Sequence, residues 1–98
     1  MAKEIKVTDG SANVFNDLGF APDVAENLLR RTDLMIEIEK WFMKSALSQT
    51  AAAQALGITQ PRFNQLLKGK IQNFTIDALV NMLTRAGMRV KITVRKAA

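Results

Sequence analysis

In the middle of the chain, the segment SQTAAAQALGITQPRFNQLLKGK begins at Ser48. It contains two residues typical of helix N-termini and, between them, a glycine typical of a helix C-terminus. Ser48 and Thr59 are residue types that cap helix N-termini, and Pro61 suits the first turn of a helix. Gly57 can adopt the left-handed conformation that ends one helix and turns the chain sharply into the next. The spacing therefore predicts two short helices joined by a tight turn, over residues 49–56 and 60–67.

The apolar residues of this segment predict how the two helices pack. Two short helices that cross closely need a small side chain where they touch, and Ala53 supplies it. Five apolar residues would hold the pair onto the rest of the domain: Ala52, Leu56, Ile58, Phe63 and Leu66. The second helix then keeps one face free, for which the candidates are Gln60, Pro61, Asn64 and Gln65.

Three further helices are predicted around this pair. Pro22 suits the first turn of the first of them, Thr75 caps the last, and Gly87 terminates that last helix. The predicted ranges are about 22–31, 33–46 and 76–86.

From Met88 onward the hydropathy period changes. Apolar residues alternate with charged or polar ones as far as Arg95, which is typical of a half-buried strand. A lone strand cannot satisfy its own backbone hydrogen bonds, so it needs a partner. That partner is either the strand-like segment at residues 5–7 or the same strand of a second subunit.

The residue types that are missing narrow the range of functions. The chain has no cysteine and no histidine. This excludes disulfides and thiolate metal sites, and it removes the usual general base, so we expect no metal, no cofactor and no enzymatic activity. The sequence shows neither a signal-peptide pattern nor an apolar run of membrane-spanning length, from which we expect a cytoplasmic protein.

Charge is distributed unevenly along the chain. Residues 1–61 carry six basic and eight acidic side chains, a net charge of −2, whereas residues 62–98 carry eight basic side chains against Asp77 alone, a net charge of +7. A basic surface of this kind attracts polyanions and speeds their encounter.

The central segment resembles the helix-turn-helix of the XRE (Cro/phage-repressor-like) superfamily, whose pattern is (S/T)Q…A…LG(I/V)(S/T)Q…(L/I)..G(K). With the flanking helices the resemblance covers residues 33–86. The VFNDLGF stretch at residues 14–20, the helix after it and the basic tail extend the likeness to the HigA-type antitoxin branch. Antitoxins of this branch repress their own operon and bind a RelE-like, ribosome-dependent RNase toxin.

The resemblance implies an all-α, lambda-repressor-like five-helix domain with a short C-terminal β-strand. We expect one compact domain in three parts: an N-terminal extension and helix (1–32), the helix-turn-helix DNA-binding domain (33–87) and a basic strand tail that is a candidate dimerisation element (88–98).

On the recognition helix, the resemblance places Gln60 and Gln65 at positions that reach base edges. A glutamine amide donates and accepts together, which fits the N6 and N7 atoms of adenine. Asn64 can do the same from a position that is used less regularly. Pro61 departs from the family pattern, because some relatives carry a polar base-reading side chain there, whereas Pro61 can only touch a thymine methyl group.

Other residues match positions that face the DNA backbone. Gln49 resembles a residue that anchors a phosphate, and Thr59 resembles one that both caps the recognition helix and faces the backbone. Arg62, Lys68 and Lys70 are expected to reach phosphates.

The resulting hypothesis is a homodimeric transcriptional repressor, and more specifically an antitoxin-type autorepressor, whose two recognition helices read an inverted repeat about one DNA turn apart. One alternative is a stand-alone regulator without a toxin. Another is a toxin-neutralising protein whose docking surface is residues 12–31 and whose DNA binding is secondary. RNA binding is disfavoured because the chain has no tyrosine and its single tryptophan lies on an apolar helix face.

Overall fold

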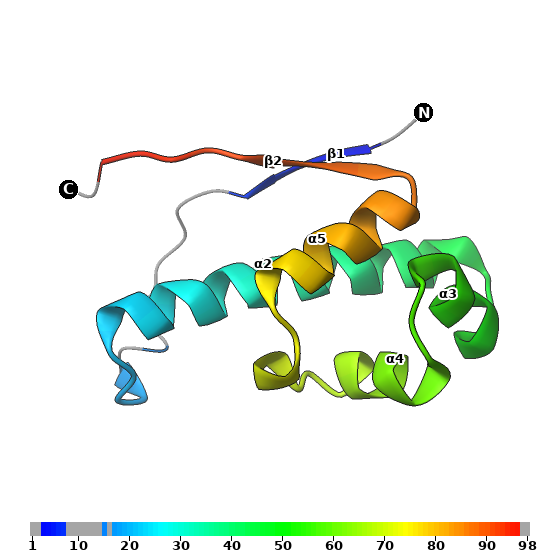
Figure 1. Cartoon of the computed structure of the whole chain (residues 1–98), viewed down its shortest axis with the longest axis horizontal. Coiled ribbons are helices and arrows are strands. Elements are labelled where there is room, and N and C mark those ends of the chain that lie inside the picture. Colours follow the sequence, from blue (N-terminus) through cyan, green and yellow to red (C-terminus); the bar gives the residue numbers. More distant parts are fainter. Residues whose placement is uncertain (1–2, 8–14, 16, 97–98) are drawn as a thin grey trace.

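The computed structural model describes residues 3–7, 15 and 17–96, which form one helical body with a small sheet along one side. The helix α2 runs the length of this body (Figure 1), with α5 and the sheet on one side of it and α4 on the other. The elements in chain order are β1 (Lys3–Val7), α2 (Pro22–Ser45), α3 (Gln49–Leu56), α4 (Gln60–Leu67), the 3-10 turn η1 (Ile71–Asn73), α5 (Ile76–Arg85) and β2 (Met88–Ile92).

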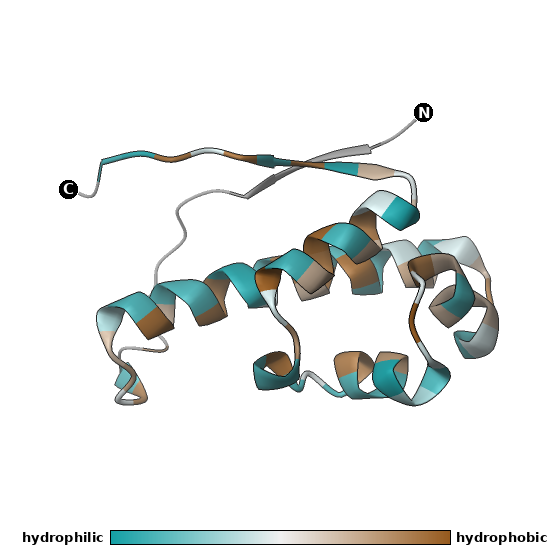
Figure 2. Ribbon diagram, in the orientation of Figure 1, coloured by the Kyte–Doolittle hydropathy of each residue, from teal (hydrophilic) through white to brown (hydrophobic). Residues whose placement is uncertain are grey.

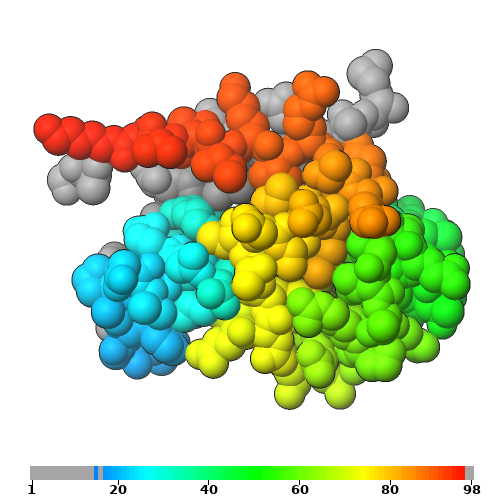
Figure 3. All heavy atoms as spheres, viewed as in Figure 1, coloured from blue at the N-terminus to red at the C-terminus, as the bar shows by residue number. Residues whose placement is uncertain are grey.

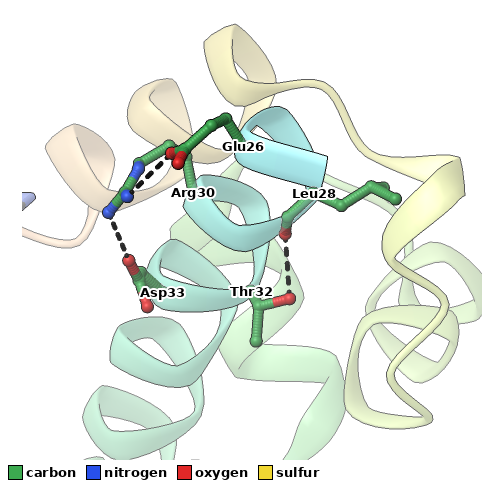
Figure 4. A network of polar contacts seen from close by, with 5 residues as sticks. All are labelled: Glu26, Leu28, Arg30, Thr32 and Asp33. Carbon is green, nitrogen blue, oxygen red and sulfur yellow. Dashed lines mark hydrogen bonds and ion pairs between the residues drawn. The ribbon is translucent and has the colours of Figure 1, made fainter. Parts of the chain in front are cut away.

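Helix α2 is one continuous element where the sequence predicted two, so the four α-helices from α2 to α5 do not match the expected count of five. The predicted break fell at Thr32, but the Thr32 hydroxyl donates a hydrogen bond of 2.9 Å to the Leu28 carbonyl one turn earlier (Figure 4). Arg30 bridges the same stretch by bonding Glu26 and Asp33, each at 3.1 Å. Ion pairs between side chains one turn apart stabilise a helix, and the Thr32 hydroxyl finds its partner within the helix, so the helix passes through a threonine that propensity alone disfavours.

The Arg30 guanidinium stays charged within this network. Burial of the side chain opposes the charge, but the hydrogen bonds to Glu26 and Asp33 outweigh that effect and raise the pKa of Arg30 above its ordinary value.

The two motif helices begin and end where the sequence predicted. Ser48 accepts a hydrogen bond from the Ala51 amide at 3.1 Å, and Thr59 accepts one from the Arg62 amide at 3.3 Å. Gly57 ends α3 with φ of +77°, in the left-handed region that glycine adopts without steric cost. The helix-turn-helix geometry is therefore confirmed.

The core fills the space between α2 and the other helices. Figure 2 shows hydrophobic and hydrophilic residues alternating around each helix, and the hydrophobic ones meet in the interior. The buried cluster comprises Leu34, Met35, Ile38, Ala52, Ala53, Leu56, Phe63, Leu66, Phe74, Leu79, Met82 and Leu83. Of the apolar residues predicted to lock the motif in place, Ile58 alone is only partly buried.

The sheet identifies the segment that pairs with the tail. β1 and β2 are parallel, with Lys3 opposite Met88 and Val7 opposite Ile92, so the tail strand pairs within the chain. Met88 and Val90 pack against the core, whereas Ile92 and Val94 are 60% and 89% exposed. The apolar row of the tail thus continues beyond the part of the molecule that covers it.

Among the described residues, no helix is both long enough and apolar enough to cross a lipid bilayer.

We predict that Gly57→Ala lowers the free energy of unfolding by about 1–2 kcal/mol, because alanine is strained at a positive φ. The added Cβ would lie 2.7 Å from Cδ of Arg85, but this is the end of an exposed, flexible side chain that can move aside. Urea denaturation measures the loss.

Gly69→Ala is the matched control, because Gly69 has φ of +76° and a Cβ added there would meet nothing within 4 Å. Similar losses in the two variants are expected. A loss in Gly57→Ala that exceeds the loss in Gly69→Ala by more than about 1 kcal/mol would show instead that Arg85 is held in place over the turn.

Candidate nucleic-acid interface

Helix α4 presents two unlike faces. Its inner face carries Phe63 and Leu66, both 0% exposed, and the Phe63 ring packs edge-on against Phe42 of α2 with 5.0 Å between centroids. Its outer face carries Gln60, Pro61 and Gln65, which are exposed, and the half-buried Asn64. The helix is thus fixed to the body by one side and offers a polar side to solvent.

An open groove of about 520 Å³ runs along the outer face of α4. In Figure 3 the side chains around α4 form the lower edge of the molecule, on the side opposite β2. Six of the nine residues predicted to bind DNA line the groove: Gln60, Pro61, Asn64, Gln65, Lys68 and Lys70. The groove lining contains two lysines, three amides and no carboxylate, so its charge is positive.

Neighbouring elements hold the two glutamine side chains of this face. The Thr50 hydroxyl, in the first turn of α3, donates to Oε1 of Gln60 at 3.3 Å. The Asn73 amide, in η1, donates to Oε1 of Gln65 at the same distance. Sequence reasoning missed Thr50 and Asn73. The predicted crossing of α3 and α4 could have indicated Thr50, whereas no spacing rule pointed to Asn73.

Three predicted residues lie outside the groove lining. Gln49 is the first residue of α3 and is half-buried, and Thr59 is the exposed N-cap of α4. Arg62 turns toward the body, where its Cζ atom lies 4.5 Å from the centroid of the buried Phe74 ring. Sequence reasoning also missed Phe74, because this residue lies in a stretch where the pattern predicts only a connection between helices.

The basic residues of the tail are remote from this groove. Arg89 and Lys91 belong to β2, which lies at the top of Figure 1 while α4 lies at the bottom. The groove and the tail are therefore separate basic surfaces, and the tail residues are not part of the surface that α4 forms.

Among the described residues, no three histidine, cysteine, aspartate or glutamate side chains come together in a way that could hold a metal ion.

We predict that Arg62→Met lowers the free energy of unfolding by about 0.5–1 kcal/mol. Methionine preserves the aliphatic cover over Phe74 but removes the cation that lies against the ring. Thermal and urea denaturation measure the change. Arg89→Met removes the same charge from an exposed strand position and is the control. Equal stability of the two variants would contradict a stabilising role for the Arg62–Phe74 contact.

Comparison with known proteins agrees with this geometry. A family described as "Helix-turn-helix domain" matches residues 14–95. A solved structure whose name places it among XRE family transcriptional regulators is similar in fold, with a TM-score of 0.71 and 33% sequence identity, and the match covers 78% of this chain and 84% of that one. The search of curated proteins found no match. The family match and the structural likeness together show that the chain belongs to the helix-turn-helix domain family, among its XRE members.

Proposed function

We propose that the protein is a sequence-specific DNA-binding repressor that inserts α4 into the major groove. The observation that carries this proposal is the outer face of α4, where Gln60, Asn64 and Gln65 lie together with Lys68 and Lys70 around one open groove. The major groove is wide enough to admit an α-helix, and side-chain amides can bond base edges there. Membership of the helix-turn-helix family and the likeness to an XRE regulator support the same function.

The residues divide by the part of the DNA they would contact. Gln60 and Gln65 read base edges, with Asn64 and Pro61 beside them. Lys68 and Lys70, just after the helix, bind phosphates, which fixes the docking register without reading sequence.

Gln49, Thr59 and Arg62 are also proposed to contact the DNA backbone, although the Arg62 side chain would first have to leave Phe74.

We further propose that the protein acts as a homodimer. One eight-residue recognition helix makes only a handful of base contacts, and a tethered second helix multiplies their effect. Ile92, the last residue of β2, and Val94, which lies beyond the paired strands, are exposed, and a second subunit that covers them would remove this apolar surface from water. The operator is then an inverted repeat with half-sites about 34–36 Å apart.

The decisive experiment is a gel-shift titration against the DNA immediately upstream of the protein's own gene, with excess competitor DNA, followed by footprinting. We expect binding that resists competitor and protects two half-sites one helical turn apart. Weak binding that disappears as salt rises would contradict the proposal, because it would show that the basic groove attracts DNA phosphates without regard to sequence.

Two variants refine this titration. Gln60→Ala is expected to weaken binding to the operator by about 1–3 kcal/mol and to remove the base preference at one base-pair position only. Lys68→Ala is expected to weaken binding to all DNA alike and to reduce the salt dependence. A base-selective loss in Lys68→Ala would make Lys68 a base-reading residue instead.

The repressor is proposed to be an antitoxin that also binds a RelE-like toxin through residues 12–31. Support comes from the likeness of residues 14–20 to the HigA branch. In the described part of this segment, the Phe15 and Phe20 rings pack with 6.2 Å between centroids, and Leu18 and Val24 are 68% and 43% exposed. Exposed apolar side chains beside an aromatic pair are suited to bind a protein partner.

We predict that co-expression of the full chain relieves growth arrest caused by a RelE-like toxin from the same operon, and that Leu18→Asp with Val24→Asp abolishes this relief while operator binding persists. Met43→Asp, at an exposed apolar position of α2 outside this segment, is the control. If no such toxin is encoded beside the gene and the operator is still bound, the protein is a stand-alone regulator.

A further inference from the structure

The amides of Gln60, the first residue of the recognition helix, and Gln65, in its last turn, are held in the same way. In each, Oε1 accepts a hydrogen bond of 3.3 Å from a residue outside α4, which is Thr50 in one case and Asn73 in the other. Asn64 lies between them along the groove, and within the described residues its side chain has no such partner. Of the three amides on this face, the two bonds therefore orient only the two glutamines.

A bond at Oε1 determines which atoms of the amide remain for a ligand. The amide is planar, so when Oε1 is directed at a neighbour, Nε2 lies on the other side of the carbonyl carbon. Both N–H donors of Nε2 and one lone pair of Oε1 then stay available. A side chain that is held before binding also loses less rotamer freedom when DNA arrives.

We propose that Thr50 and Asn73 are positioning residues for base readout, which orient Gln60 and Gln65 so that each presents the Nε2 donors to an acceptor on a base edge. The inference rests on the proposed function. In the major groove the acceptors are purine N7, guanine O6 and thymine O4, whereas cytosine N4 and adenine N6 are donors. Each glutamine therefore discriminates against base pairs that place an amino group of cytosine or adenine opposite Nε2.

The two contacts come from different parts of the fold, which makes their effects separable. Thr50 belongs to α3 and Asn73 belongs to η1, after the recognition helix. Each contact supports one glutamine, so each governs a different base-pair position. Loss of one contact leaves readout at the other position unchanged.

The test measures the affinity of the full chain for a panel of operators that carry each of the four base pairs at every position. Gln60→Ala and Gln65→Ala first identify the position that each glutamine reads. Thr50→Val, which replaces the hydroxyl by a methyl group, is expected to reduce base preference by roughly three- to tenfold at the Gln60 position only. Asn73→Ala is expected to do the same at the Gln65 position, and Thr50→Ser restores preference.

Matched controls come from α5, away from the groove. Thr84→Val removes a hydroxyl that bonds the Val80 carbonyl, and Asn81→Ala removes an exposed amide. Both are expected to leave every base preference unchanged. In the Gln60→Ala background, Thr50→Val is expected to have no further effect on base preference, because its influence passes through the missing amide.

Three results would overturn the inference while the proposed function survives. The first is a Thr50→Val variant that weakens binding to all operators by one common factor. The second is a Thr50→Val variant that binds every operator with wild-type affinity. The third is an additive loss of base preference when Thr50→Val is made in the Gln60→Ala background. A common factor would mean that Thr50 contacts phosphate directly. If the wild-type protein itself prefers no base at any position, the proposed function fails, and this is seen before any variant is compared.

Discussion

The burial of Phe63 is the interaction on which the rest of the structure depends. This side chain joins the recognition helix to the body, since its ring packs edge-on against Phe42 of α2 and is fully removed from solvent. An apolar anchor on one side of a short helix determines which side faces outward. The polar groove, its lysines and the two held glutamines are consequences of that single orientation.

The long helix α2 supplies the rigid support that this anchor needs. Short helices gain most of their stability from packing rather than from their own hydrogen bonds, and α3 and α4 have eight residues each. Because α2 continues through Thr32 without a break, one rod carries the contacts to α5, to the 3-10 turn and to the sheet. Arg31 adds to this by bonding the Ile71 carbonyl at 3.3 Å, which ties the rod to the chain after the recognition helix.

Local signals allowed much of this structure to be predicted, and non-local contacts explain what was missed. Caps and a left-handed glycine act within one turn, so the ends of α3 and α4 could be read from Ser48, Gly57 and Thr59. The groove-lining residues followed from the same helix face. By contrast, the position of Arg62 depends on Phe74, which no pattern near Arg62 reveals. The continuity of α2 likewise depends on the ion pairs of Arg30 with side chains one turn away, which intrinsic propensity does not include.

The parallel pairing of β1 with β2 has a consequence for the order of folding. Lys3 pairs with Met88, so the partners are 85 positions apart in the chain, and every helix lies between them. Closing so long a loop is entropically costly and slow compared with forming contacts between neighbouring helices. During synthesis the helices can therefore assemble while β1 is still unpaired, and the sheet forms last, once β2 has left the ribosome.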